Sequence, residues 1–228
     1  IESDGYVRVK RHGGSDNMIA ASKTVLIHTH DNTTIKALFG SPAVHVRDKY
    51  TEMGPEQHEL WLDLGVDSAE KVRELGVEVG CIATFDDQFS ELGDYYVGRS
   101  LDNKIGGYII AQVMKRIAAH KSKPAFTLVC LNAIQEEIGG HGAMMATYRL
   151  KPDLCVCLDV THATDTPGID PAKHGNVKLG GGPSVTHGTA NHPLMVKYLL
   201  EVAKGKSIPI QHESSSRFSG TDTDKIFH

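Results

Sequence analysis

The sequence predicts an α/β protein in which a mainly parallel sheet is flanked by helices and is accompanied by a small β-barrel-like domain. Residues 1–95 hold many short strand-like runs separated by turn signals, a pattern typical of a small barrel. In residues 96–228, buried strand-like runs alternate with helix-like runs, as they do in parallel sheets covered by helices. We therefore expect two domains, one formed by residues 1–95 and one by residues 96–228.

Composition and charge exclude several classes of protein. The chain has 228 residues and a formal net charge of −4, so it offers no basic surface for nucleic acid. It has no apolar run long enough to cross a membrane. Four cysteines, which we expect to be reduced, and the lack of a visible signal peptide predict a cytoplasmic protein. Because the first residues look like the middle of a strand and the last like the start of a helix, we expect both ends of a longer chain to be missing.

The first domain is expected to consist mainly of strands. Asp31 and Asn32 form a turn signal between two of them, and Ser68 can cap a short helix that carries Glu70 in its first turn. We see no catalytic constellation here, and the scattered histidines are interpreted as surface or structural residues. The expected strands are 5–11, 24–30, 34–40, 58–66, 81–85 and 95–97.

The second domain begins with a helix over residues 101–120, whose apolar residues recur at helical spacing and whose cap is Asp102 or Asn103. A glycine- and proline-rich loop is expected over residues 161–183, and Asn191 is the expected cap of the last long helix. The remaining expected elements are buried strands at 125–133 and 154–160, helices at 139–150 and 191–204, and a strand at 208–212.

Four carboxylates are expected to meet at one edge of the parallel sheet. Glu136 and Glu137 follow the first buried strand, Asp159 ends the second, and Asp102 starts the helix before them. Clustered acids repel one another, and divalent cations remove that repulsion. A bridging aspartate with one further acid for each ion supports a two-metal site, and a carboxylate that is not a ligand can then accept a proton from water. The same glutamate pair also fits a solvated acidic start of the next helix.

Zinc would also require a histidine on each ion. His141, His162 and His228 are nearest to the acids in the sequence, but the residues alone do not select any of them. Each is interpreted first as a helix-surface or loop residue.

Five segments carry a resemblance to a known family. SLDNKIGG, AIQEEIGGHGA, LDVTHATDTPG, KLGGGPSV and SGTDTDKI occur in the order and spacing of the M42 family of metallo-aminopeptidases, which includes glutamyl and tetrahedral aminopeptidases. The resemblance covers nearly the whole chain. It implies a zinc-peptidase-like catalytic domain with an inserted dimerisation domain at residues 1–95. It also implies peptide substrates, two divalent metal ions per subunit (zinc or cobalt), and homo-oligomers from a dimer up to a dodecamer.

The resemblance implies a role for each acid. Asp102 resembles the aspartate that bridges the two metals, Glu136 the general base, and Glu137 and Asp159 the ligands of one ion each. Asp222 matches a family motif near the site without a role assigned to it. The family's two histidine ligands fall outside this chain, so we expect the chain as given to bind metal poorly and to be inactive on its own.

Two other functions remain open at this point. Paired carboxylates also serve glycoside hydrolases, which need no metal, although the 6% aromatic content and the single Trp61 argue against sugar-binding platforms. Alternatively, the β-rich part is an assembly or peptide-binding module, and the α/β part has lost its metals.

Overall fold

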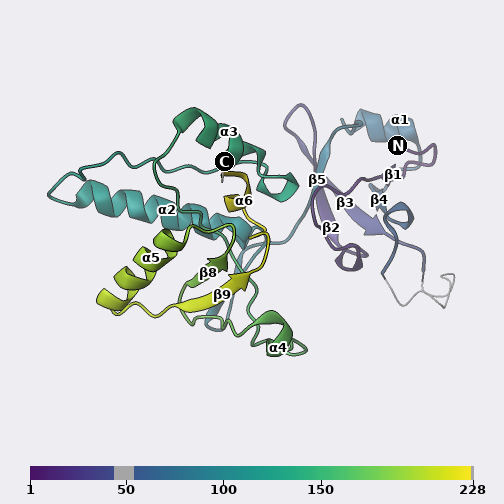
Figure 1. Ribbon diagram of the computed structural model, residues 1–228. Coiled ribbons are helices and arrows are strands. Elements are labelled where there is room, and N and C mark those ends of the chain that lie inside the picture. Colours follow the sequence, from purple (N-terminus) through teal and green to yellow (C-terminus); the bar gives the residue numbers. More distant parts are fainter. Residues whose placement is uncertain (44–53, 227–228) are drawn as a thin grey trace. The chain divides into compact units, whose positions relative to one another are not determined.

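Figure 1 shows the computed structural model, which describes residues 1–43 and 54–226. The chain divides into two compact units, Ile1–Arg99 and Ser100–His228. The predicted boundary after residue 95 lies four residues before this division. His45, one of the scattered histidines of the first domain, and His228 lie outside the described residues.

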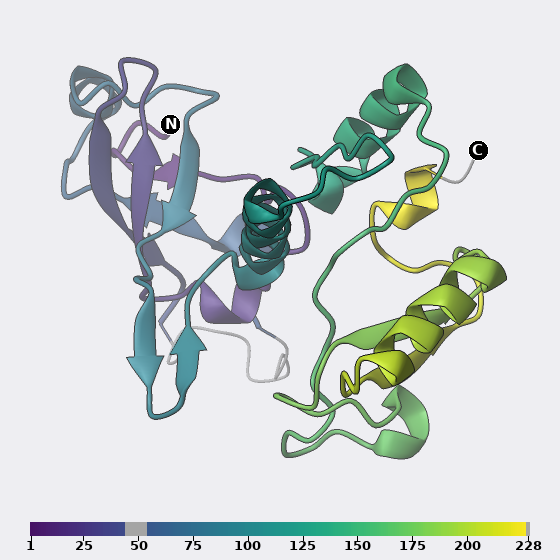
Figure 2. The ribbon, with the colours of Figure 1, turned by 90° about the vertical axis from the view of Figure 1, so that its left-hand side faces the viewer.

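The first unit contains a curled antiparallel sheet of five strands in the order β1-β4-β3-β2-β5 (Figures 1 and 2). The hairpin between β2 and β3 runs in register from Thr24↔Leu38 to His28↔Thr34. Its turn follows the prediction, because Asn32 has a φ of +64° and the Asp31 carboxylate accepts the amide of Thr33. The strands are β1 (Val7–Arg8), β2 (Thr24–His28), β3 (Thr34–Gly40), β4 (Trp61–Asp63) and β5 (Ile82–Phe85).

The core of the first unit lies between this sheet and helix α1 (Ala69–Glu74). Inward-facing residues alternate along β2, so that Val25 and Ile27 are buried beside Leu62 of β4. Val72 of α1 completes the cluster and is fully buried. The Ser68 hydroxyl accepts the amide of Lys71, so the predicted helix cap is confirmed.

Four further short elements belong to the described part of the first unit. The hairpin of β6 (Ser90–Leu92) and β7 (Tyr95–Val97) contains the predicted strand at 95–97 and a partner that the sequence did not reveal. The expected strand 58–66 is reduced to β4, because residues Gln57–Glu59 form the 3-10 helix η2. A further 3-10 helix, η1, spans Asn17–Ile19.

The second unit is mainly helical. Its one pair of β-strands among the described residues, β8 (Ser184–Gly188) and β9 (Gln211–Ser215), is parallel. No helix in residues 1–43 and 54–226 is long and apolar enough to cross a membrane. The helices are α2 (Leu101–Ala119), η3 (Glu136–Ile138), α3 (His141–Leu150), α4 (Pro171–His174), α5 (Pro193–Gly205) and α6 (Thr223–Ile226).

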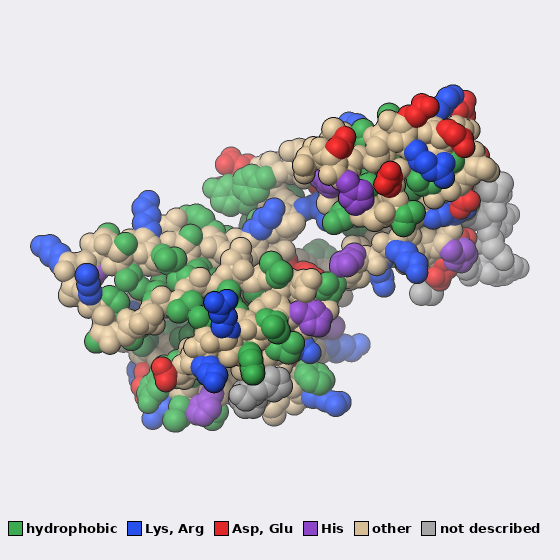
Figure 3. All heavy atoms as spheres, turned by 90° about the horizontal axis from the view of Figure 1, so that it is seen from above, with side chains coloured by type: hydrophobic (Ala, Val, Ile, Leu, Met, Phe, Trp, Pro, Cys, Tyr) green, Lys and Arg blue, Asp and Glu red, His purple; other side chains and the backbone are tan. Residues whose placement is uncertain are grey.

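The structure is mixed α/β as predicted, but the described residues do not clearly form the expected mainly parallel sheet. Residues 125–133 and 154–160 are not paired as strands, although their apolar composition predicted buried strands. Apolar composition signals a tendency to be buried, whereas a strand also needs a neighbour that accepts its backbone hydrogen bonds. Phe126 is 66% exposed and Leu154 is 69% exposed. Hydrophobic side chains are accordingly scattered over the face of this unit seen in Figure 3.

Smaller differences concern the end of the chain. Helix α5 is capped by His192, whose ring accepts the amide of Leu194, and not by Asn191. Pro193 occupies the first turn as predicted. Strand β9 begins three residues later than predicted, and β8 and α4 formed without a recognised signal.

Candidate active site

The charges of the predicted acids in the second unit act on Glu136. Burial raises the pKa of Glu136, and the negative charges of Asp159, Glu137, Asp222 and Asp102 raise it further. Burial also raises the pKa of Asp159, and the charge of Asp102 adds a smaller increase. The amide of Val160 donates to the Asp159 carboxylate and has the opposite effect, because it stabilises the charged form. Glu136 is therefore within electrostatic range of the other three predicted acids and of Asp222.

Asn103 explains why Asp102 and Asp159 lie near each other. Its side-chain amide donates to the carbonyl of Leu158 at 2.6 Å, and its carbonyl oxygen accepts the amide of Gly106 at 2.9 Å. The second bond is the one that a capping residue makes, although the helix is assigned from Leu101 and Asp102 and Asn103 lack helical dihedral angles. Gly106 permits this approach, because a Cβ atom there would collide with the Asn103 side chain. Asn103 thus ties the start of α2 to the segment that carries Asp159.

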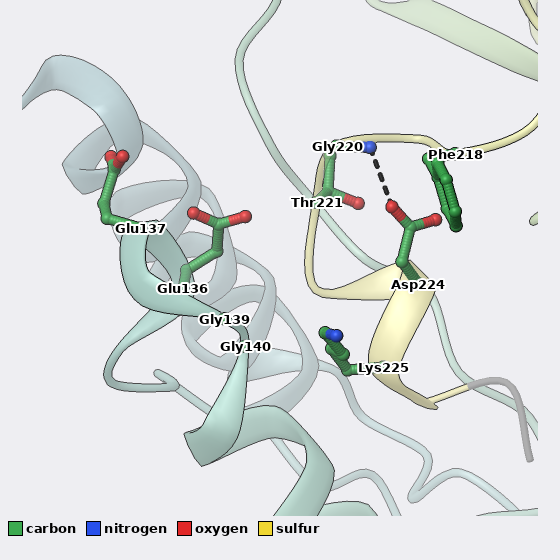
Figure 4. A pocket seen from close by; sticks show the side chains of 9 residues that line it. All are labelled: Glu136, Glu137, Gly139, Gly140, Phe218, Gly220, Thr221, Asp224 and Lys225. Atoms are coloured by element: carbon green, nitrogen blue, oxygen red, sulfur yellow. Dashed lines mark hydrogen bonds between the residues drawn. The ribbon is translucent and has the colours of Figure 1, made fainter. Parts of the chain in front are cut away.

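Glu136 and Glu137 lie in η3 and differ in direction. Glu136 is half-buried and points toward α6, whereas Glu137 is exposed and points away from it (Figure 4). The turn is followed by Gly140, which has a φ of +64°. A Cβ atom at Gly140 would lie 2.6 Å from Cγ of Lys225 and 3.1 Å from Oδ1 of Asp222. Glycine at this position therefore allows the loop before α6 to approach the glutamates.

Asp224 anchors that loop. Its carboxylate accepts the amide of Ser219 at 2.8 Å, the Ser219 hydroxyl at 2.9 Å and the amide of Gly220 at 2.9 Å. Burial opposes ionisation, but these bonds and the nearby charge of Lys225 outweigh it and lower the pKa of Asp224. Asp222 has the opposite environment: burial and Asp159 raise its pKa, and its buried Oδ1 has no hydrogen-bond partner in the described part of the chain.

A pocket of about 360 Å³ opens between η3 and this loop (Figure 4). Lys225 is the cationic residue of the described wall, whose other charged side chains are carboxylates. The sequence analysis assigned no role to Phe218, Asp224 or Lys225, although the last two lie in the SGTDTDKI segment, because no local pattern tells a pocket-lining side chain from a solvated one. The lining residues are Glu136, Glu137, Gly139, Gly140, Phe218, Gly220, Thr221, Asp224 and Lys225.

The donor set fits divalent cations in chemistry but not in spacing. Carboxylate oxygens suit such ions, and an unpaired buried oxygen on Asp222 is the kind of acceptor that a cation would satisfy. Within residues 1–43 and 54–226, however, no group of three or more His, Cys, Asp or Glu side chains is arranged to hold a metal ion. His141 and His162 are exposed and belong to no such group among these residues.

The fold and the site together define a mixed α/β protein with a carboxylate-rich pocket. Comparison with protein families narrows this class. The model of the family described as M42 glutamyl aminopeptidase matches residues 1–228, so the chain belongs to the M42 family.

Individual relatives agree with this assignment. FrvX of Escherichia coli K12 is 33% identical over 187 residues, which cover 81% of this chain and 51% of FrvX. The lysyl aminopeptidase of Pyrococcus furiosus is 28% identical over 229 residues, which cover 98% of this chain and 63% of that protein. The chain thus spans between about half and two thirds of the length of these relatives.

Solved structures give the same result. The structure of a TET aminopeptidase from Thaumarchaeota archaeon SCGC AB-539-E09 matches with a TM-score of 0.90 and 26% identity, over 99% of this chain and 64% of that one. The aminopeptidase APDkam598 from Desulfurococcus kamchatkensis matches with a TM-score of 0.85 and 29% identity, over 97% of this chain and 61% of that one.

Proposed function

We propose that this protein is a metal-dependent aminopeptidase that removes amino-terminal residues from peptides. The observation that carries the proposal is the shared environment of Asp102, Glu136, Glu137, Asp159 and Asp222 beside a pocket. So many acids in one place are costly without a cation. Family membership supplies the reaction class.

Asp102, Glu137 and Asp159 would hold two divalent ions, with Asp102 as a ligand of both and zinc or cobalt as the expected metals. Because these carboxylates are not spaced as a ligand group among the described residues, binding the ions would draw them closer together. When bound, such ions polarise the scissile carbonyl and make water a stronger nucleophile. Asn103 orients this ligand set, because it fixes the start of α2 against Leu158, the residue before Asp159.

Glu136 is the proposed general base. It is half-buried, it points into the pocket, and its raised pKa makes its carboxylate a stronger proton acceptor than an exposed glutamate. It accepts a proton from the attacking water and returns it to the nitrogen of the leaving amine. Asp222 lies close enough to raise the pKa of Glu136 further and so favours the same role.

The site favours peptide hydrolysis over the glycosidase alternative. Phe218 is the single aromatic side chain among the described residues of the pocket wall, and sugar-binding sites depend on aromatic platforms. We further propose that the protein is a cytoplasmic homo-oligomer, between a dimer and a dodecamer, in which residues 1–95 contribute the dimer contact. Light scattering of the complete gene product tests the assembly.

The decisive experiment combines metal analysis with kinetics on the complete gene product. We expect about two transition-metal ions per chain after dialysis and peptidase activity that a chelator abolishes. Glu136→Gln should lower kcat about 10²–10⁴-fold while leaving the metal content unchanged. The matched control is Glu201→Gln, at an exposed glutamate of α5 whose only described ion pair is with Lys197. A Glu136→Gln rate within about twofold of wild type would remove the proposed base.

A further inference from the structure

Two histidines meet on the parallel strand pair of the second unit, outside the carboxylate site. His187 of β8 and His212 of β9 place Nε2 of the first 2.9 Å from Nδ1 of the second. Their ring centroids are 5.2 Å apart, and the ring planes are inclined by 35°. In the register of the strands His187 lies beside Ser214 and His212 beside Val185, so the two rings share one face of the ladder.

The distance between the two nitrogens is the one that a metal ion with ligands at right angles requires. Imidazole nitrogens bind transition metals at about 2.0–2.1 Å, so two such bonds at 90° place the nitrogens about 2.9 Å apart. Two bonds at the tetrahedral angle would separate them by about 3.4 Å. The 2.9 Å spacing is also that of the present hydrogen bond, and rings that keep it would suit square-planar or octahedral ions, copper(II) and nickel(II), better than tetrahedral zinc.

The surroundings keep the pair accessible and hold its spacing. His212 is exposed and His187 is half-buried. The backbone ladder fixes the two strands over five register pairs, from Ser184↔Gln211 to Gly188↔Ser215. The neighbouring Glu213 is engaged elsewhere, since its carboxylate accepts the hydroxyl of Thr161. Among the described residues, the facing nitrogens of the two rings have only each other as hydrogen-bond partners.

We propose that His187 and His212 form a two-nitrogen site for copper(II) or nickel(II), with water in the remaining positions. The ion replaces the N–H···N hydrogen bond. The ring that donated this bond loses the proton from its facing nitrogen to solvent and takes up one on its other nitrogen, so no net proton is released by the neutral pair. Each ring then carries its proton on the nitrogen that faces away from the ion.

The site has a consequence for the pocket. β9 leads directly into the loop anchored by Asp224, and the Ser215 hydroxyl at the end of β9 donates to the carbonyl of Phe218 in the pocket wall. An ion that joins β8 to β9 therefore stabilises the strand from which this wall extends.

The test is a nickel(II) titration of the complete protein whose carboxylate site has first been loaded with zinc. We expect one further nickel ion per chain, bound at least about tenfold more weakly by His187→Ala and by His212→Ala. His174→Ala is the matched control, because His174 is an exposed histidine of α4 in the same unit. It should bind nickel as wild type does.

Two readouts besides affinity separate this site from a simple histidine contact. Electron paramagnetic resonance of bound copper(II) should report two nitrogen ligands in wild type and fewer in either variant. Nickel should raise the Tm of wild type and of His174→Ala but not that of His187→Gln, which keeps a polar side chain on the strand. Equal nickel affinity and equal Tm shifts in all variants would overturn the proposal and leave the pair as a hydrogen-bonded contact.

Discussion

The two units differ in how they bury apolar side chains. The first unit closes a core in which Val72 is 0% exposed, while Val25 and Leu62 are each 1% exposed. In the second unit, the buried apolar residues are mainly small, such as Ala143 and Ala203, and long apolar side chains remain exposed on helices and unpaired segments. On the face seen in Figure 3, hydrophobic side chains are scattered over the second unit, while Asp and Glu side chains are more frequent on the first. The fold of the first unit is therefore stabilised by packing, whereas the site of the second depends on a few polar contacts.

The largest expected effect contrasts two leucines. Leu62→Ala empties a buried position and should lower the free energy of unfolding of the first unit by about 3–5 kcal/mol. Leu154→Ala in this chain removes a side chain that is 69% exposed and should change stability by less than about 0.5 kcal/mol. Fluorescence of Trp61, the single tryptophan and the neighbour of Leu62, reports unfolding of the first unit, and circular dichroism reports both units.

Equal losses of stability in the two leucine variants would contradict the comparison. That result would mean that residues 154–160 are covered in solution, and the exposed apolar face of the second unit would then be an interface.

The elements that the sequence predicted correctly are those whose signals lie close together in the chain. The β2–β3 hairpin and the Ser68-capped helix α1 were predicted correctly, because turn and cap signals act between residues that are close in sequence. β8 and the unpaired segment 154–160 were not, because pairing depends on a partner distant in the chain. Periodicity within a segment does not identify that partner.

The residues of the candidate site also differ in whether a local sequence signal points to them. The four acids were singled out because each lies at the end of an apolar run or the start of a helix, and their roles as metal ligands and general base stay a prediction. Asp224 and Lys225 were missed, since their contacts depend on the approach of α6 to Gly140. Long-range contacts of this kind leave no periodic pattern in the sequence.

The second effect in size concerns the contact that orients the acids. Asn103→Ala removes the bonds to Leu158 and Gly106 and should cost about 1–3 kcal/mol of stability. It should also lower kcat of the complete protein by about 10²-fold, because small displacements of reacting groups are costly. The measurements are kinetics and metal content on the same preparation.

Asn103→Asp is the informative companion variant. It keeps an oxygen for the Gly106 amide but loses the donor to Leu158 and adds a charge beside the acids. If both Asn103 variants kept wild-type kcat, the tie between α2 and residues 154–160 would have no part in orienting Asp102.

A third effect concerns the glycine-rich segment before β8. The Gln211 side chain accepts the amide of Lys178 at 2.7 Å and donates to the carbonyls of Lys178 and Gly182 at 3.0 and 2.9 Å. Gln211→Ala should therefore destabilise the second unit by about 1–2 kcal/mol. Gln88→Ala is the control, because the Gln88 amide bonds only to the nearby Asp86 among the described residues. Equal stability of the two variants would show that the segment holds its shape without Gln211.

The smallest effect is a pH dependence that arises from Asp224. Burial opposes ionisation of Asp224, but the amides of Ser219 and Gly220 lower its pKa in the folded protein below that of the unfolded chain. The charged form therefore stabilises the fold above the unfolded pKa of about 3.9, and this contribution disappears as the pH falls through the lower folded pKa. Asp224→Asn removes the charge and one of the two side-chain oxygens that accept the amides of Ser219 and Gly220. Its deficit in stability relative to wild type should thus be largest near neutral pH and should shrink below about pH 4.

Denaturant titrations at neutral and acid pH measure this deficit, with Asp153→Asn, at an exposed carboxylate, as the control. A deficit that stayed constant with pH would assign the role of Asp224 to hydrogen-bond geometry alone, without a contribution from its charge.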